Sequence, residues 1–124
     1  MVSKVKDKVV LITGGAGNIG SYILDKVLEQ KPSKCIVVDN LFNSDKSYHK
    51  LNDKCVKFYP LDISKLDEMD YIFDTYKPNY VFHCASMLIQ DSETLPRKSI
   101  NTNIMGTFNI VDLSNKYGVE KICY

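Results

Sequence analysis

The hydrophobic positions of the chain gather in short, nearly unbroken runs, separated by longer stretches that mix polar and apolar residues. A strand that is apolar on both faces is typical of a parallel sheet covered by helices on either side. The pattern therefore predicts buried strands at residues 8–13, 35–39, 56–59, 80–83 and 119–124.

The first intervening stretch places apolar residues at helical spacing and predicts a helix at residues 19–30. Two further helices are expected at about residues 64–76 and 96–116. The second helix begins at Ser64-x-x-Asp67, which resembles a capping box with Asp in place of Glu or Gln. Gly118 follows the third, in the position that glycine often takes at helix ends. Residues 40–54 are polar and predict a loop with a short helix.

The order strand–helix–strand at the start of the chain requires a right-handed crossover between parallel strands. We find no internal repeat, low-complexity segment or linker in the sequence. The chain is therefore predicted to form one domain, residues 1–124. We expect an α/β fold with a parallel sheet of about five strands and helices on both faces.

Composition and charge narrow the class of protein. Hydrophobic residues make up 44% of the chain and charged residues 25%, the balance of a globular domain rather than of a disordered segment. The net charge of +1 provides no broad field for nucleic acid or an anionic membrane. No apolar run reaches the ~20 residues of a membrane span, and the first is too short for a signal peptide. We expect a cytoplasmic protein that binds neither nucleic acid nor membrane.

The four cysteines lack the paired C-x-x-C spacing of zinc sites and redox motifs. Each lies in or beside a predicted strand, which favours buried, reduced thiols in a cytosolic core. His49 and His83 have no cysteine or carboxylate at ligand spacing. No metal site is therefore predicted.

Glycines are concentrated between the first predicted strand and the first predicted helix. Residues 15–20 read G-A-G-N-I-G, and Asp39 lies nineteen residues further on, at the end of the second strand, as in dinucleotide-binding folds. Glycine permits the tight turn and the close approach of a pyrophosphate, which backbone N–H groups and the helix dipole then bind. The Asp39 carboxylate is placed to accept hydrogen bonds from a ribose and to repel a 2′-phosphate. The sequence predicts a Rossmann-type domain with NAD as cofactor; a glycine turn without a ligand is the alternative.

Two other nucleotide-binding folds are excluded by single residues. A P-loop has Lys and then Ser or Thr after its last glycine, whereas Ser21 and Tyr22 follow Gly20 here. A methyltransferase usually carries an acidic residue just before its glycine loop, and Thr13 occupies that position.

Residues 13–20 read T-G-G-A-G-N-I-G, which resembles the T-G-G-x-G-x-x-G fingerprint of the extended short-chain dehydrogenases/reductases. That group includes nucleotide-sugar epimerases and dehydratases. The classical subgroup would need a glycine at position 18, and Asn18 excludes it. Further stretches are similar to motifs of the family in order and spacing, those of UDP-glucose 4-epimerases among them. They lie at residues 39–44, 62–63, 78–86 and 103–107.

The resemblance covers the whole chain and implies a set of contacts to NAD. These come from the glycine turn, the ends of the second and fourth strands, the acid-plus-aliphatic pair after the third strand, and the long helix. The implied cofactor-binding residues are Gly14, Gly17, Asn18, Ile19, Gly20, Asp39, Asn40, Asp62, Ile63, Cys84, Ala85, Ser86 and Asn103.

Several of these polar residues have a structural role as the alternative. Asp62 is either an adenine contact or a solvated loop acid, and Asn103 either bonds backbone near the nicotinamide or is an exposed helix amide. Asn40 and Asn43 either bind the adenosine region or shape a turn. His83 ends a buried strand, which favours a core or backbone-organising role over catalysis.

The chain also departs from the family pattern. Asn18 replaces a common aromatic residue, Asn79 an aspartate, Ser86 an alanine or glycine, and Leu88 a frequent lysine. The resemblance therefore carries over neither a particular sugar nor a nucleotide. It also leaves open the choice between epimerase, dehydratase and dehydrogenase.

In the family, the catalytic Ser or Thr and a Tyr-x-x-x-Lys pair lie beyond the fifth strand, and this sequence ends at Tyr124. Two literal Tyr-x-x-x-Lys matches begin at Tyr22 and Tyr117. We interpret both as coincidental, because one lies on the predicted phosphate-binding helix and the other straddles a helix end. No catalytic residue is therefore predicted, and we expect a fold that is incomplete at its C-terminus.

The first hypothesis is the NAD-binding portion of an NAD-dependent nucleotide-sugar epimerase/dehydratase-like enzyme. For the complete enzyme, the resemblance implies hydride transfer through NAD, a nucleotide-sugar substrate and, as a further expectation, a homodimer. The chain alone is expected to be inactive. The alternative is a stand-alone NAD(H)-binding module without catalysis.

Overall fold

The computed structural model describes residues 4–44 and 49–124. The predicted apolar runs form the strands β1 (Val9–Thr13), β2 (Lys34–Val38), β3 (Val56–Tyr59), β4 (Tyr80–His83) and β5 (Lys121–Cys123). They pair in parallel in the order β3-β2-β1-β4-β5. The chain changes direction across the sheet at β1, and parallel sheets bind ligands at the carboxyl ends of the strands beside such a point. The prediction of a five-stranded α/β Rossmann-type sheet is confirmed.

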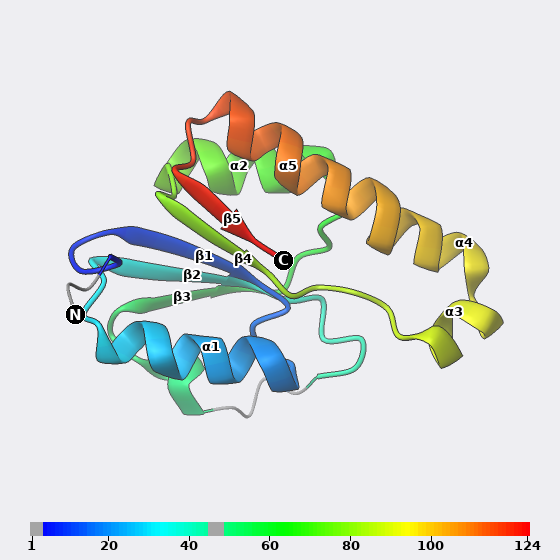
Figure 1. Ribbon diagram of the computed structural model, residues 1–124. Coiled ribbons are helices and arrows are strands. Elements are labelled where there is room, and N and C mark those ends of the chain that lie inside the picture. The colour runs from blue at the N-terminus through cyan, green and yellow to red at the C-terminus, as the bar shows by residue number, and fades with distance from the viewer. Residues whose placement is uncertain (1–3, 45–48) are drawn as a thin grey trace.

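Helices cover both faces of this sheet. They are α1 (Asn18–Glu29), α2 (Leu66–Tyr76), α3 (Ile89–Thr94), α4 (Pro96–Ser99) and α5 (Thr107–Lys116), with the 3₁₀ helix η1 (His49–Asn52) and the π-helix η2 (Ile100–Gly106). Figure 1 shows α1 on one face and α2 and α5 on the other. The short helix η1 lies in the segment predicted as a loop with a short helix; residues 45–48 of that segment lie outside the described residues.

Side chains of the strands alternate between two hydrophobic clusters, one on each face. Val10 and Ile12 of β1 belong to the cluster of Leu24 on α1, whereas Leu11 belongs to the cluster of Phe73 on α2. All five side chains are fully buried. Because burial of each such side chain stabilises the fold by about 1.5–3 kcal/mol, this packing holds the carboxyl ends of the strands in a fixed arrangement.

The second predicted helix begins later than its sequence pattern indicates. α2 starts at Leu66, and its N-cap residue Lys65 makes no side-chain capping bond. The N–H of Ser64 donates to Asp62 Oδ1 at 2.9 Å, which closes an Asx turn before the helix. The predicted capping box at Ser64 is wrong, because this turn places Ser64 ahead of the N-cap position.

The predicted helix at residues 96–116 is present, but its middle is π-helical. α4, η2 and α5 follow one another without a break, and residues 100–106 form the π segment. π segments occur often at functional sites. A Cβ on Gly106 would lie 2.6 Å from Ile63 Cδ1, so the helix passes closely over Ile63 at the end of this segment.

Two features of the C-terminal half differ from the prediction. The helix α3 was not predicted, because its six residues are too few to show a helical period. The last strand is confined to Lys121–Cys123, and Cys123 is exposed instead of buried. Its exposure follows from its place, because β5 lies beside β4 at the edge of the sheet that the described residues form.

Candidate functional site

The glycine turn between β1 and α1 forms one wall of the candidate site. Gly17 is the N-cap residue of α1, and no side chain caps this helix. The Gly14 N–H donates to Val38 O at 2.7 Å, and the Gly17 N–H donates to Gly14 O at 3.1 Å. The first N–H groups of a helix lack partners within it and carry the positive end of its dipole. The start of α1 therefore suits an anion such as a pyrophosphate.

The glycines of this turn serve different purposes. Gly14 has a φ of +68°, and a Cβ there would lie 2.7 Å from Ala85 N; a Cβ on Gly20 would lie 2.2 Å from Gly14 O. Backbone atoms at such distances cannot yield, so packing requires both glycines. A Cβ on Gly17 would meet only Gly14 O, at 3.3 Å. Gly17 also lines both the recess and the groove described below, so its missing side chain leaves space for a ligand.

The Asp39 carboxylate joins the glycine turn to the loop after β2. Its Oδ2 accepts the Ala16 N–H at 3.0 Å, and its Oδ1 accepts the Leu41 N–H at 2.8 Å and the Ser44 hydroxyl at 2.7 Å. Asp39 is only 6% exposed, so these bonds satisfy a buried charge. Oδ2 keeps acceptor capacity for a further donor, such as a ribose hydroxyl.

A recess of about 110 Å³ opens at the carboxyl ends of the strands, and a wider groove of about 670 Å³ adjoins it over the start of α1. The predicted residues that line the recess are Gly14, Gly17, Asp39, Asn40, Ile63, Cys84, Ala85 and Ser86. The groove adds Asn18, Ile19 and Gly20. Residues more than sixty positions apart in the chain are thus brought to one place, but their contacts to a cofactor stay a prediction.

Asp62 and Asn103 are predicted site residues that line neither the recess nor the groove. Asp62 accepts the Ser64 N–H, as described above. Asn103 Oδ1 accepts the Met87 N–H at 2.7 Å, and its Nδ2 donates to Met87 O at 3.0 Å. Each thus shapes backbone beside the recess, since Ile63 and Met87 line it.

Sequence reasoning missed several lining residues, among them Phe42, Leu61, Met87 and Thr102. Leu61 and Met87 adjoin predicted positions, so a search extended by one residue along each motif would have found them. Thr102 likewise adjoins the predicted Asn103 and lines the recess from the π segment.

His83 organises the backbone beneath the recess. Its Nδ1 bonds Thr13 Oγ1 at 2.6 Å, and its Nε2 bonds Thr107 Oγ1 at 2.8 Å. Thr13 Oγ1 also accepts the Ala85 N–H at 3.3 Å. The imidazole therefore ties β1, β4 and α5 together, in agreement with the organising role expected for this residue.

Stability is expected to depend on pH through His83. Burial lowers the pKa of this imidazole below its ordinary value of 6.5. The unfolded chain therefore binds a proton at a higher pH than the folded chain, and the free energy of unfolding should fall as pH drops below about 6.5. Urea denaturation of the unmodified protein and of His83→Gln between pH 8 and pH 5 measures this effect. The variant should show the weaker pH dependence; identical curves would contradict the assignment.

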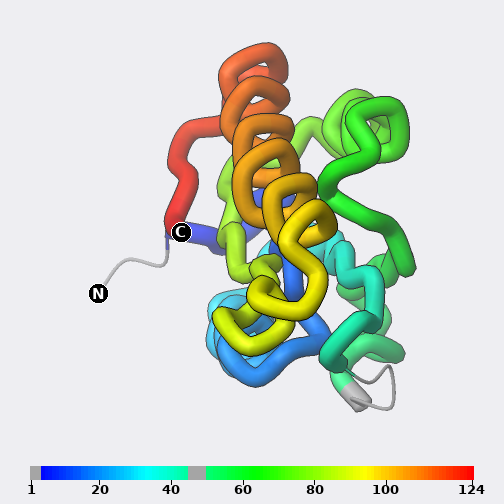
Figure 2. The backbone as a smooth tube through the Cα atoms, turned by 90° about the vertical axis from the view of Figure 1, so that its right-hand side faces the viewer, coloured from blue at the N-terminus to red at the C-terminus, as the bar shows by residue number. Residues whose placement is uncertain are grey.

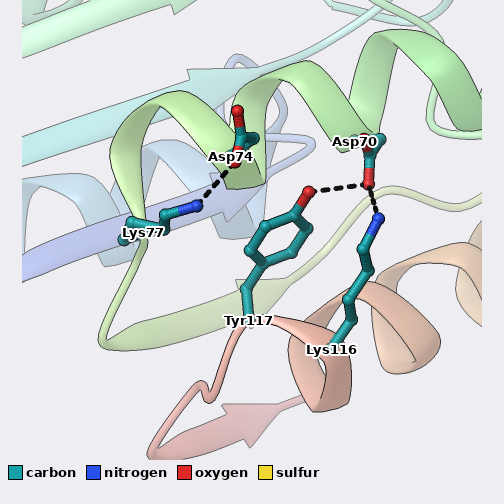
Figure 3. A network of polar contacts seen from close by, with 5 residues as sticks. All are labelled: Asp70, Asp74, Lys77, Lys116 and Tyr117. Carbon is teal, nitrogen blue, oxygen red and sulfur yellow. Dashed lines mark hydrogen bonds and ion pairs between the residues drawn. The ribbon is translucent and has the colours of Figure 1, made fainter.

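Tyr117 begins one Tyr-x-x-x-Lys match and lies in a polar network between α5 and α2 (Figure 3). Its hydroxyl donates to Asp70 Oδ1 at 3.0 Å, and Lys116 Nζ bonds the same oxygen at 2.7 Å. Hydrogen bonds from Lys116 and then from Tyr117 lower the pKa of Asp70. The network lies near the amino-terminal ends of β4 and β5, and the glycine turn lies at the carboxyl ends of the strands.

Tyr22 begins the other match and lies on α1, with its side chain 64% exposed. Lys26 of this match bonds Glu29 Oε1 at 3.0 Å. Neither Tyr22 nor Tyr117 lines the recess or the groove. Both matches thus lie apart from the candidate site.

Within residues 4–44 and 49–124, no group of three or more His, Cys, Asp and Glu side chains could hold a metal ion. In those same two ranges, no helix is both long and apolar enough to cross a bilayer. All four cysteines are free, and burial raises the pKa of Cys35 to about 12.

Comparisons with known proteins agree with this geometry. Residues 10–124 match the NAD dependent epimerase/dehydratase family. The UDP-glucose 4-epimerase of Dictyostelium discoideum is 33% identical over 123 residues, which cover 95% of this chain and 36% of that protein.

Two solved structures have the same fold. The UDP-glucose 4-epimerase of Thermotoga maritima, solved with UDP-glucose, is 36% identical with a TM-score of 0.84. The UDP-glucose 4-epimerase of Thermus thermophilus, solved with NAD, is 30% identical with a TM-score of 0.81. Each alignment covers 92% of this chain and 36% of the solved chain, so the present chain spans about a third of these relatives.

The family match extends from β1 to the end of β5 and includes every residue that lines the recess and the groove. It confirms the resemblance predicted from the glycine turn and the motifs that follow it. The family uses NAD, which is the cofactor predicted from the glycine turn and Asp39. The chain belongs to the NAD dependent epimerase/dehydratase family.

Proposed function

We propose that this chain is the NAD-binding portion of an NAD-dependent nucleotide-sugar epimerase/dehydratase-like enzyme. The observation that carries the proposal is the recess at the carboxyl ends of the strands, where the uncapped start of α1 and the buried Asp39 carboxylate lie on adjoining walls. An anion-binding helix start beside a carboxylate suits a pyrophosphate linked to a ribose.

Different residues of the recess would contact different parts of NAD. The backbone around Gly17 would hold the pyrophosphate, Asp39 the adenosine ribose, and the apolar Ile63 the adenine. Residues 84–86, at the end of β4, would support the nicotinamide end, and His83 keeps them in place through Thr13. When bound, NAD supplies the acceptor and donor of a hydride; the described residues bind and orient the cofactor.

A nucleotide sugar is the substrate class that we propose for the complete enzyme. Support comes from the relatives named above, since the Thermotoga maritima epimerase was solved with UDP-glucose. The present chain would contribute the cofactor site to that reaction. The free cysteines are compatible with a reducing compartment, and we propose the cytoplasm as the location.

The experiment that tests NAD binding is a calorimetric titration of the purified chain. Saturable binding of NAD at a ratio of one per chain is expected. Loss of the signal in a variant of the glycine turn would link it to the recess. Absence of binding by a chain that circular dichroism shows to be folded would contradict the proposal.

The 124-residue chain alone is expected to have no turnover. Of the two tyrosines in Tyr-x-x-x-Lys matches, Tyr117 is bonded to Asp70 and Tyr22 lies on the exposed side of α1, so neither can exchange a proton with a substrate at the recess. NAD reduction and UDP-sugar epimerisation assays on purified protein should give rates equal to the buffer control. Turnover that disappears in Tyr22→Phe or Tyr117→Phe would show that one of these matches is catalytic.

We also propose that two copies of the chain associate. Ile100, Ile104, Phe108 and Val111 form an exposed apolar stripe along η2 and α5, each side chain 47–61% exposed. A stripe of this kind marks an interaction surface, and antiparallel pairing of two such helices would bury both stripes. Size-exclusion chromatography across concentration should show a dimer that Ile104→Glu abolishes and that a control, Asn115→Asp on the same helix, retains. A monomer at every concentration would contradict this proposal.

A further inference from the structure

Two contacts join a loop that lines the recess to the helices α3 and α4. Phe42 and Asn43 of this loop, which follows β2, line the recess. Asn43 Nδ2 donates to Asp91 Oδ2 of α3 at 2.6 Å, and Lys98 Nζ of α4 lies 3.7 Å from the centroid of the Phe42 ring. We call these two contacts the clasp. In Figure 2, the carboxyl ends of the strands face the viewer, and the yellow helices α3 and α4 lie in front of the sheet.

The loop half of the clasp is anchored from within. As described above, Asp39 holds Leu41 and Ser44, the residues on either side of Phe42 and Asn43. Phe42 is 37% exposed, so its ring is not fixed by burial alone. Asn40 Oδ1 also accepts the Phe42 N–H at 3.0 Å, so the backbone of the loop is held from within. The side chains of Asn43 and Phe42 take their partners from Asp91 and Lys98.

The helical half of the clasp is tied to the wall of the recess. Ser99 Oγ donates to Ser92 Oγ at 2.7 Å, which links α4 to α3. Asn103 Nδ2 donates to Ser99 Oγ at 3.3 Å, and the same amide bonds both backbone groups of Met87. These bonds place α3 and α4 in a fixed relation to Met87, which lines the recess.

We propose that Asp91 and Lys98 are positioning residues for the cofactor: through the clasp they hold Asn43 and Phe42 against the adenosine end of the recess and slow the release of NAD. The proposal rests on the proposed function, since it presumes that NAD occupies this recess. Neither Asp91 nor Lys98 lines the recess or the groove, so both act through the loop.

The chemistry of the two contacts suits this role. A carboxylate that accepts an amide N–H makes a charge-assisted hydrogen bond, which is stronger than a neutral one. An ammonium group over an aromatic ring is attracted by the negative face of the ring. Both contacts form without the cofactor, so they hold the loop in its binding conformation before NAD arrives. Their loss should therefore weaken binding, and among variants of one site such a loss appears mostly as faster dissociation.

Stopped-flow fluorescence with NADH on the folded chain separates these two rates. Asp91→Ala and Lys98→Met are each expected to raise the dissociation rate roughly fivefold, with association rates and unfolding midpoints close to those of the unmodified chain. Lys98→Arg should restore slow release, because arginine keeps the cation over the ring. The matched control is Glu93→Gln, which changes an exposed acid on α3, the helix of Asp91. This variant should leave both rates unchanged.

A double-mutant cycle distinguishes the clasp from a general effect of charge. Asn43→Ala in the Asp91→Ala background should raise the dissociation rate less than it does in the unmodified chain, since the partner is already absent. Dissociation rates that stay unchanged in both Asp91→Ala and Lys98→Met, or fully independent effects in the cycle, would overturn the proposal while NAD binding stands. A folded, unmodified chain that binds no NADH would instead contradict the proposed function and, with it, this inference.

Discussion

A Gly17→Val variant is expected to lose NAD affinity by roughly 100-fold or more while keeping its fold. A Cβ at this position would lie 3.3 Å from Gly14 O, a tight contact that a small shift of the turn relieves. The rest of the side chain would enter the space beside the uncapped start of α1, where the pyrophosphate is proposed to bind. Valine would fill the space and shield the N–H groups. Calorimetric titration with NAD, together with circular dichroism, measures both parts of the prediction.

Gly20→Ala provides the contrast for this experiment. Its Cβ would lie 2.2 Å from Gly14 O, and two backbone segments cannot both keep their places at that distance. This variant should lose stability, so its loss of binding would report misfolding and not a blocked ligand. A Gly17→Val protein that is folded and binds NAD with unchanged affinity would refute the pyrophosphate assignment.

The second large effect is expected in the choice of cofactor. The unmodified chain should bind NADP roughly 30-fold or more weakly than NAD, because the Asp39 carboxylate would face the 2′-phosphate. Asp39 also holds Ala16, Leu41 and Ser44, so Asp39→Asn should weaken the binding of both cofactors. Its ratio of NADP to NAD affinity should nevertheless rise, since the repulsive charge is gone.

Ser44→Ala separates the two roles of Asp39. This variant removes one hydrogen bond to Asp39 Oδ1 and leaves the charge in place. It should weaken NAD and NADP binding to the same degree and keep the preference for NAD. Equal or tighter binding of NADP by the unmodified chain would show that Asp39 does not set the choice of cofactor.

The fold was predictable because its signals are local. Each central strand is a continuous apolar run, and the sheet buries both faces of that run, as for Leu11 and Ile12 of β1. The requirements of the glycine turn are also local. Gly14 has a positive φ, and a Cβ on Gly20 would collide with Gly14 O of the same turn. Patterns of this kind depend on neighbours a few residues away, which the sequence displays directly.

The parts that escaped prediction depend on distant residues. The bond from Ala16 to Asp39 spans 23 positions and the clasp between Asn43 and Asp91 spans 48, so no local pattern indicates either. Thr102 lines the recess from a π segment, and the helix predicted at residues 96–116 did not indicate that geometry. The capping box predicted at Ser64 failed for a local reason, because Asp62 forms a turn with Ser64 instead. The capping-box motif and the turn motif overlap in the sequence, and the sequence alone does not show which of the two forms.

The central claim is that NAD binds at the carboxyl ends of the strands, between the glycine turn and the segment after β4. At 14.1 kDa, the chain is small enough for residue-by-residue amide NMR during a titration with NAD. The largest chemical-shift changes are expected for the amides of Gly17, Asp39, Ile63 and Ala85. The amides around Tyr117, near the amino-terminal ends of the strands, should change little. Saturating shifts that gather at Tyr117 and leave Gly17 and Asp39 unmoved would contradict the account.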